Sequence, residues 1–424
     1  MKLKSIYIAL GLSLLLSGCK SEEPAPQAEN AAPFVSFTIA LSMESNGTRA
    51  DARIADGEDP NTGIGGDNEW GNGGTESGTE FENTVNNIIP VLYSATKQPN
   101  GKVTINSAYP VGTMVNAVYD RNDTDGTLTI TGQLKTEIPA SMLEEEGHTY
   151  RLAVFVNAKN GFDIYKPEQN TFHRHGIPSA LEIDGDPEKR TGIPMYGVHE
   201  VKFDGLANGL KDGKYLDSNN PYVLGETFTI PVLRSMAKVI VRVDEEKLAG
   251  RDVKLSKVEI SRHVNKGYLV PKGWDTCTSV SELTLTGAMN GYVGTLDQDY
   301  DKNCPILPTD DNTNSDTFLR FFLPETYNCN HDDISTTEPI KLTVTYTSDG
   351  TSDEKTGVIY FANYDDDGKP TDWKKNAWDI IRNHIYEFVI EGVEASTGEL
   401  KVNVSVKPWE KHHFEFNEDE ILVK

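Results

Sequence analysis

The stretch that decides the fold is FVSFTIALSMESNGTRAD, residues 34–51. Its first half alternates between apolar residues and small or hydroxyl-bearing ones, and the apolar members are Val35, Phe37, Ile39 and Leu41. A repeat of two residues is typical of a β-strand that buries one of its faces. We therefore predict a core strand at the start of the folded part of the chain.

The second half of this stretch is polar and carries an arginine. Asn46 and Gly47 favour an exposed turn, and Arg49 follows two residues later. Arg53 lies a little further along the chain. A trypsin-like protease can cut a segment of this kind, so the sequence places a cleavable loop directly behind a core strand.

Strands also dominate the rest of the chain. Ten further segments are short and apolar or alternating, and Gly, Asn, Asp and Pro separate them: 88–93, 151–156, 228–233, 238–243, 253–260, 318–323, 340–346, 358–361, 386–390 and 402–406. Helices are scarce, with a short candidate at 141–146 and a turn expected within 373–380. Short strands without helices between them indicate an all-β fold of antiparallel sandwiches.

The chain begins with a secretory signal. Residues 1–18 have a basic start, an apolar stretch and small residues before Cys19, which is the pattern of an export signal and not of a membrane span. Leu16-Ser17-Gly18-Cys19 resembles the lipobox of bacterial lipoproteins. That resemblance implies that Cys19 becomes a lipidated N-terminus held in the outer membrane. Residues 19–33 are rich in Pro, Ala and Glu, so we predict a flexible tether there.

The composition argues against some partners and leaves the cysteine pairing open. The formal net charge is −25, and Lys and Arg form no long run, so nucleic acid is not an expected partner. The cysteines after the lipobox are Cys277, Cys304 and Cys329, without Cys-x-x-Cys spacing. An exported chain can pair two of these three, and the sequence does not decide which two.

The length of the chain and its punctuation indicate two domains. About 400 residues follow the signal, which is enough for two or three domains. A polar stretch before a new strand places a boundary near 221–225, with a β-sandwich over 34–222 and a second one over 223–424. Eight glycines lie between residues 57 and 78 among polar residues, which predicts a mobile loop over 57–80.

The sequence contains no complete catalytic or metal-binding motif that we can identify. His199-Glu200 begins a zinc-protease motif, but Phe203 stands where the second histidine is needed, and the segment is predicted to be a strand. Residues 363–368 resemble the start of a calcium loop, but Lys374 occupies the position of the required glutamate. An acidic turn is the expected structure there. We therefore expect no metal, no cofactor and no enzymatic activity.

Several segments together resemble the fimbrillin family, the type V pilins of Gram-negative bacteria. Besides the lipobox at Cys19, they are IPMYG (193–197), IPVLRSMAKVIVRV (230–243), LSKVEISRHVNKGYLVP (255–271), FFLPETY (321–327), RNHIYEFVIEG (382–392) and VNVSVKPW (402–409). These segments span most of the mature chain. The resemblance implies two β-sandwich domains of transthyretin-like topology, in agreement with the strands predicted above.

The resemblance also implies that the first strand is temporary. Stalk subunits of this family reach the surface as lipoproteins, and an arginine-specific protease cuts the loop behind the first strand. A neighbouring subunit then fills the groove that the lost strand leaves. Here the removable strand would be 34–41, with Arg49 as the cleavage site and Arg53 as the alternative. The chain would be a cell-surface fimbrial subunit, partnered by further copies in a homopolymer or by related subunits, with roles in adhesion and biofilm.

The donor strand for the next subunit would come from residues 402–424. Its two candidate pairs of inserting side chains are Phe414 with Phe416 and Ile421 with Val423. The two pairs differ in parity, so the register breaks at the acidic residues between them. Which pair inserts is open, and residues 402–406 belong either to the last fixed strand or to the donor.

Two other functions stay open at this point. A fimbrial tip or anchor subunit could keep its lipid and its first strand, in which case Arg49 is an ordinary loop residue. A monomeric surface lipoprotein that binds glycans or host proteins is an alternative from another class, with Trp70 in the glycine-rich loop as a candidate contact. The other tryptophans, such as Trp274, are expected to fill the ends of the sandwich cores.

Overall fold

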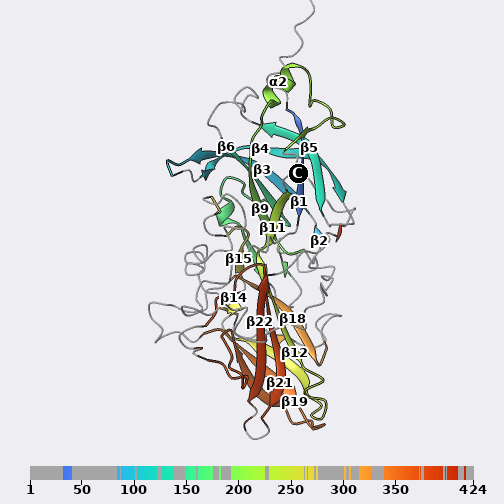
Figure 1. Ribbon diagram of the computed structural model, residues 1–424, viewed down its shortest axis with the longest axis vertical. Coiled ribbons are helices and arrows are strands. Elements are labelled where there is room, and N and C mark those ends of the chain that lie inside the picture. Colours follow the sequence, from blue (N-terminus) through green and yellow to red (C-terminus); the bar gives the residue numbers. More distant parts are fainter. Residues whose placement is uncertain are drawn as a thin grey trace, which may run out of the picture.

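The computed structural model describes these residues of the chain: 32–40, 84–85, 87–100, 103–121, 127–136, 149–158, 161–174, 181–182, 192–224, 229–261, 263–264, 266–271, 274–275, 300–301, 305–306, 315–325, 339–371, 373, 377–394, 397, 399–408 and 415–416. They form an elongated molecule with one β-sheet assembly toward each end of its long axis (Figure 1). Strands make up most of the regular structure of this described part, which confirms the all-β prediction.

The first assembly is an eight-stranded sheet that closes on itself. Its strands, in the order in which they pair, are β10 (Tyr222–Val223), β1 (Phe34–Ala40), β11 (Thr229–Arg234), β9 (Met195–Val201), β6 (Thr149–Val156), β3 (Ile88–Lys97), β4 (Val103–Arg121) and β5 (Leu128–Thr136). β1 additionally pairs with β5, the strand at the far end of this order. β1 is therefore the strand that closes the sheet into a ring.

The closed sheet encloses one hydrophobic core and is partly covered outside. Apolar side chains of β1 share the inner core with residues of the surrounding strands, among them Ile130, Leu152 and Ile230, each at most 2% exposed. On the outer face, the ring of Tyr93 packs edge-on against Trp274, with 5.6 Å between the centroids. Trp274 is 2% exposed, so this tryptophan fills a core, as expected.

The second assembly is a sandwich of two four-stranded sheets. One sheet has the order β18 (Phe318–Pro324), β12 (Met236–Val243), β21 (His384–Val393), β22 (Leu400–Pro408), and the other has β17 (Pro305–Ile306), β13 (Lys254–Ile260), β19 (Lys341–Thr347), β20 (Lys355–Tyr360). Side chains from both sheets form one core, in which Phe321, Tyr346 and Phe388 are fully buried. Alternate residues of each strand point to the same face, which is why the period-two segments supply this core.

Short elements complete the described part of the chain. They are β2 (Thr84–Val85), β7 (Thr171–Arg174), β8 (Leu181–Glu182), β14 (His263–Val264), β15 (Lys266–Tyr268), β16 (Tyr300–Asp301), β23 (Glu415–Phe416), the 3-10 helix η3 (Pro167–Gln169) and the helix α2 (Leu206–Lys211). β15 pairs with β7, which joins the second half of the chain to the first. Within the described residues, neither helix has the length and apolar character needed to cross a membrane.

All ten additional strands predicted from the sequence overlap observed strands, but the first sheet differs from expectation in two respects. β4 and β5 are not among the predicted strands, although they form one side of the ring. β1 and β11 run parallel to each other, whereas antiparallel neighbours were expected, and in the sandwich β12 and β21 are parallel as well. The first assembly is thus one mixed sheet that curls round its core, and the second is a pair of facing sheets.

The topology also shifts the division between the two halves. β10 and β11 lie at or beyond the expected boundary near 221–225, yet both pair with β1 in the first sheet. The physical reason is that Ile230 and Val232 are buried in the first core. Ser235 is the single residue between β11 and β12, so the chain passes from one assembly to the other there. The domain limits stay a prediction, and Ser235 is the better place to draw the division.

A buried arginine fastens the two assemblies near this passage. Arg382, whose side chain is 3% exposed, forms an ion pair with Glu325 at 2.9 Å. It also donates hydrogen bonds to the backbone carbonyls of Leu269 at 3.0 Å and Tyr268 at 3.2 Å. The hydroxyl of Ser235 donates to the same Leu269 carbonyl at 2.8 Å. Because Leu269 packs on the outer face of the first sheet, these bonds tie that sheet to the sandwich.

We predict that Arg382→Ala lowers the free energy of unfolding by about 3 to 5 kcal/mol, because the carboxylate of Glu325 stays buried without its cation. The matched control is Lys247→Ala, which breaks the 2.8 Å pair with Glu391, whose side chains are 56% and 27% exposed. An exposed pair contributes about 0 to 1 kcal/mol. Urea unfolding followed by circular dichroism measures both variants, and equal losses would contradict the assigned role of Arg382.

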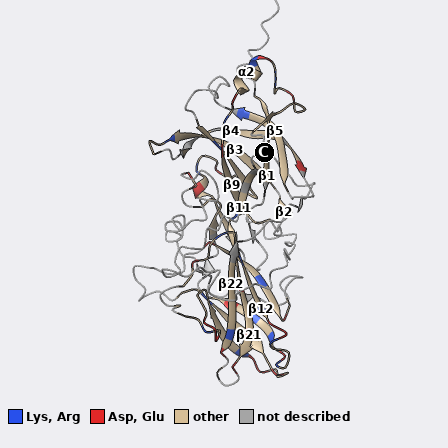
Figure 2. Cartoon of the chain, viewed as in Figure 1, with Lys and Arg blue, Asp and Glu red and all other residues tan. Residues whose placement is uncertain are grey.

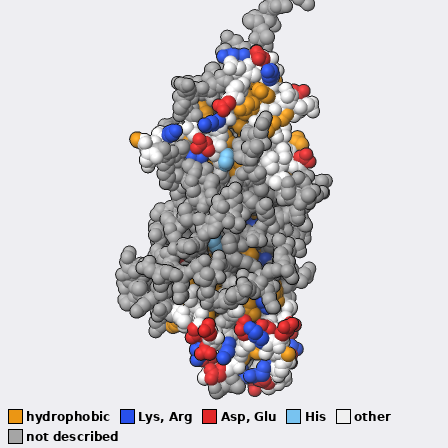
Figure 3. Space-filling model, viewed as in Figure 1, with side chains coloured by type: hydrophobic (Ala, Val, Ile, Leu, Met, Phe, Trp, Pro, Cys, Tyr) orange, Lys and Arg blue, Asp and Glu red, His pale blue; other side chains and the backbone are white. Residues whose placement is uncertain are grey.

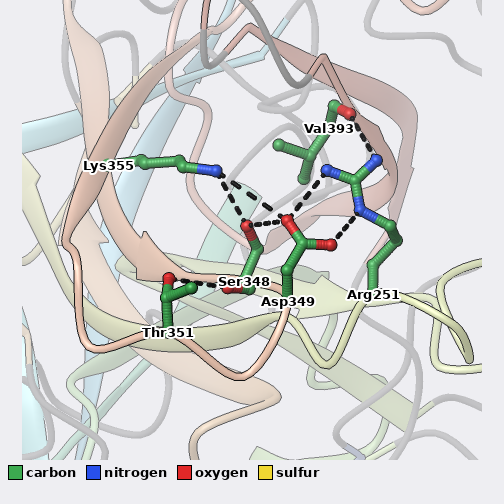
Figure 4. A network of polar contacts seen from close by, with 6 residues as sticks. All are labelled: Arg251, Ser348, Asp349, Thr351, Lys355 and Val393. Atoms are coloured by element: carbon green, nitrogen blue, oxygen red, sulfur yellow. Dashed lines mark hydrogen bonds and ion pairs between the residues drawn. The ribbon is translucent and has the colours of Figure 1, made fainter.

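A polar network ties together the loops at the far end of the sandwich (Figure 4). Arg251 donates from Nε and Nη2 to the two carboxylate oxygens of Asp349, at 2.6 and 3.2 Å. Ser348 donates to Asp349 at 2.9 Å, and Lys355 donates to Ser348 at 3.0 Å. Arg251 also reaches the carbonyl of Val393. On the face shown in Figure 3, charged side chains of both signs gather at this end of the molecule.

We predict that Asp349→Asn lowers the melting temperature at neutral pH. Hydrogen bonds from Arg251 and then Ser348 hold the pKa of the Asp349 carboxyl below its usual value of 3.8. A group with a lowered pKa stabilises the fold above the pKa of the unfolded chain, and this stabilisation is lost as the pH falls through the folded-state pKa. The difference in melting temperature between wild type and variant should therefore shrink below pH 3.8.

The control for this prediction is Asp353→Asn, in the exposed part of the same β19–β20 hairpin. Its melting temperature should follow that of the wild type at every pH. A difference between wild type and Asp349→Asn that persists unchanged into strong acid would show that the ion pair is not its cause.

Candidate functional site

β1 is hydrogen-bonded along both of its edges. β5 runs antiparallel along one edge, from Phe34 opposite Gln133 to Ile39 opposite Leu128. The other edge is shared by two parallel strands, with β10 beside the start of β1 and β11 beside its end. All three partner strands are remote from β1 in the sequence. We call the space that β1 occupies between β5 and the β10–β11 edge the β1 slot.

The inner row of β1 fills the first core. Val35, Phe37 and Ile39 are 1%, 2% and 0% exposed, as the alternation in the sequence predicts. Gly132 lies opposite Val35, and a Cβ atom there would come within 2.6 Å of Cγ of Met114, so the glycine gives Met114 room to pack. β1 contains no charged residue and is tan along its length in Figure 2. The slot therefore takes an uncharged strand with three buried apolar side chains.

The middle of the outer row of β1 carries two hydroxyl side chains that meet hydroxyl side chains of β5. Oγ1 of Thr131 donates to Oγ of Ser36 at 2.9 Å, and these residues lie directly opposite each other. The hydroxyl oxygens of Thr38 and Thr129, the next opposite pair, are 3.2 Å apart. We call these four residues the hydroxyl row. Ser36 is only 7% exposed, so the outer side of β1 is also covered at this point.

The start of β1 is held by contacts outside the sheet. The amide of Leu134 donates to the carbonyl of Pro33 at 2.7 Å, so Pro33, at the predicted end of the tether, is held against β5. The amide of Phe34 donates to the carbonyl of Tyr215 at 2.8 Å. The ring of Tyr215 in turn packs edge-on against Tyr222 of β10, at 5.2 Å. These contacts cap the end of the slot at which β1 enters.

The remaining predicted site residues fall partly outside the described part of the chain. This applies to Cys19, Arg49, Arg53 and Leu41 in the N-terminal region and to the side chains of Phe414, Phe416, Ile421 and Val423 in the tail. The three cysteines Cys277, Cys304 and Cys329 lie outside it as well. The structure thus locates the strand predicted to be removable and the slot that it occupies, while its removal and the lipidation, cleavage and disulfide assignments stay predictions.

Two parts of the predicted donor region do have a place in the structure. Val402 and Val404 of β22 are 2% and 4% exposed in the second core, and β22 pairs with β21 along its length. Residues 402–406 therefore belong to a fixed strand of the sandwich. Further along, β23 pairs in parallel with β2 in the first half of the chain, with Phe416 opposite Val85.

The structure shows where two other motifs considered in the sequence lie, and in the described part of the chain neither forms the site that its pattern suggests. His199 and Glu200 lie on β9, a strand, so they lack the helical spacing of a zinc-protease motif. Glu200 forms an ion pair with buried Arg151 at 3.2 Å, and burial followed by the charge of Arg151 lowers the pKa of His199. Residues 365–368 form the expected turn, closed by the amide of Gly368 on the carbonyl of Asp365. No group of metal-ligating side chains occurs among the described residues.

Comparisons with known proteins give two fimbrial structures of low similarity. No protein-family model matches the chain, and no curated protein matches it. The tip fimbrial protein Mfa3 from Porphyromonas gingivalis, with a C-terminal truncation, is 12% identical with a TM-score of 0.48, covering 89% of this chain and 99% of that one. A fimbrial assembly protein from Parabacteroides distasonis is 11% identical with a TM-score of 0.39, covering 89% and 96%.

We predict that Phe37→Ala lowers the free energy of unfolding by about 3 to 5 kcal/mol, because it empties a fully packed position of the first core. Thr38→Ala on the outer row should lower the free energy of unfolding by less than about 1 kcal/mol, the contribution of a single cross-strand pair. Denaturant unfolding of the full-length chain measures both. Similar losses for the two variants would show that β1 does not bury one face as described.

Proposed function

We propose that this chain is a structural subunit of a cell-surface fimbria and that β1 is the temporary occupant of its slot. In the assembled fibre a strand from a neighbouring subunit would take the place of β1. The observation that carries the proposal is the pairing of β1 on both edges with strands remote in sequence. A strand bound in this way can leave while β11, β9, β6, β3, β4 and β5 keep their order in the sheet.

Removal of β1 would leave a site with a high affinity for another strand. It would leave unpaired backbone groups along β5 and along the β10–β11 edge, and such edges attract another strand. It would also uncover the core positions of Val35, Phe37 and Ile39. Burying three side chains of this size stabilises a protein by about 5 to 9 kcal/mol in total. An incoming strand regains both contributions, so its release would be very slow.

The steps that would lead to the removal of β1 are inferred from the sequence. The signal over 1–18 and the lipobox at Cys19 would bring the precursor to the outer membrane as a lipoprotein. An arginine-specific surface protease would then cut after Arg49 or Arg53, both behind β1 in the chain. The cut separates the rest of the subunit from β1 and from the lipid at the same time, which couples release from the membrane to opening of the slot.

The similar structures named above are fimbrial proteins, so a place in a fimbria and a role in adhesion at the cell surface accord with them. Its partners would be other fimbrial subunits. A stalk position fits best, because a removable first strand has a use only where a neighbour supplies the replacement.

We predict that limited trypsin treatment of the full-length chain produces a new N-terminus at Ala50, or at Ile54 if Arg53 is the site. N-terminal sequencing identifies the cut. After the cut, incubation in mild denaturant should let a labelled peptide with the sequence of 33–41 enter the slot, because β1 is then no longer covalently attached. The bound label is counted after gel filtration.

The control is the variant Arg49→Gln/Arg53→Gln, which should stay uncut at this segment and capture no peptide. Capture that is equal in cut and uncut chains would show that covalent attachment of β1 does not govern the slot. Failure of the cut wild-type chain to take up the peptide would overturn the proposal.

A further inference from the structure

We infer that the β1 slot selects its incoming strand by the hydroxyl row as well as by the apolar core. The inference rests on the proposed exchange of β1. The two pairs of the row, Thr131 with Ser36 and Thr129 with Thr38, are directly opposite in register and in hydroxyl contact. Thr129 and Thr131 are the residues that stay when β1 leaves. The partner that they fit is a strand of the pattern apolar, Ser or Thr, apolar, Ser or Thr, apolar.

The burial of Ser36 on the outer side of β1 gives this selection its strength. A hydroxyl group both donates and accepts, so the two hydroxyls of each pair can bond directly to each other. Ser36 is 7% exposed, so a charged side chain at its position would lose most of its water. An apolar side chain there would instead leave the hydroxyl of Thr131 without this partner. Both replacements weaken the incoming strand, for different reasons.

The selection bears on which chain supplies the strand. If Phe414 and Phe416 entered neighbouring core positions, Glu415 between them would stand in the hydroxyl row in either register and in either direction. If Ile421 and Val423 entered, Leu422 would stand there. Neither segment has the hydroxyl pattern. The strand that fits therefore carries the hydroxyl pattern and is neither of these two tail segments of a second copy.

The test uses the full-length chain after cleavage, with two slots and three peptides. The slots are those of the wild type and of Thr129→Val/Thr131→Val, which replaces the hydroxyls of β5 by methyl groups of the same shape. The peptides are FVSFTIA, FVVFVIA and the tail sequence HHFEFNE, each followed by two lysines for solubility. Competition against a labelled FVSFTIA peptide gives the relative affinity of each peptide for each slot.

In the wild-type slot, FVVFVIA should bind about tenfold more weakly than FVSFTIA, the order expected for two cross-strand pairs. The tail peptide should bind more weakly still. In the Thr129→Val/Thr131→Val slot the preference between the first two peptides should disappear or reverse. The single variant Thr131→Val should show about half of this change on a logarithmic scale, and it serves if the double variant folds poorly.

Two results would overturn the inference and leave the proposed function intact. One is an equal preference for FVSFTIA in both slots, and the other is tight binding of the tail peptide to the wild-type slot. If neither slot takes up any peptide after cleavage, β1 is not exchangeable, and the proposed function and this inference fall together.

Discussion

The structure depends on the backbone pairing of β1 with strands on both of its edges. Without β1, the edge of β5 and the edge formed by β10 and β11 would face each other with no strand between them. The first core would then lose three of its fully buried side chains. Main-chain pairing is largely independent of sequence, whereas core filling depends on side-chain size. The same site therefore combines a general attraction for any extended strand with a preference for particular ones.

The two halves of the molecule are coupled by buried polar contacts and not by a loose linker. Arg382 joins Glu325 and the carbonyls of Leu269 and Tyr268, while Trp274 from the same segment packs on the outer face of the first sheet. Breaking a buried ion pair is far more costly than breaking an exposed one. The first sheet and the sandwich are thus held in one arrangement, and the fold beyond the slot provides a firm base for the exchange.

The sequence predicts local features well and long-range pairing poorly. The inner row of β1 and the sandwich strands follow from period-two alternation alone. β4 escapes prediction because Pro110 and Gly112 interrupt its pattern, and because its ladder with β3 shifts register. β11 follows a polar stretch that resembles a boundary, and its long-range pairing with β1 and β9 shows that it belongs to the first sheet. The hydroxyl row could not be predicted, because its paired residues are 91 and 95 positions apart in the sequence. The alternation in LTITG at 128–132 does, however, indicate a strand with hydroxyl side chains on one face.

The single residue Ser235 between β11 and β12 has a mechanical consequence for a fibre. A strand inserted in the slot lies beside β11, and β11 continues almost without interruption into the sandwich. A force along this line would shear the ladder between the inserted strand and β11. Its hydrogen bonds would then have to break together and not one after another. Tension would then pass through each subunit along the continuous chain of β11 and β12. The bonds of Arg382 would keep the two assemblies from rotating relative to each other under this force.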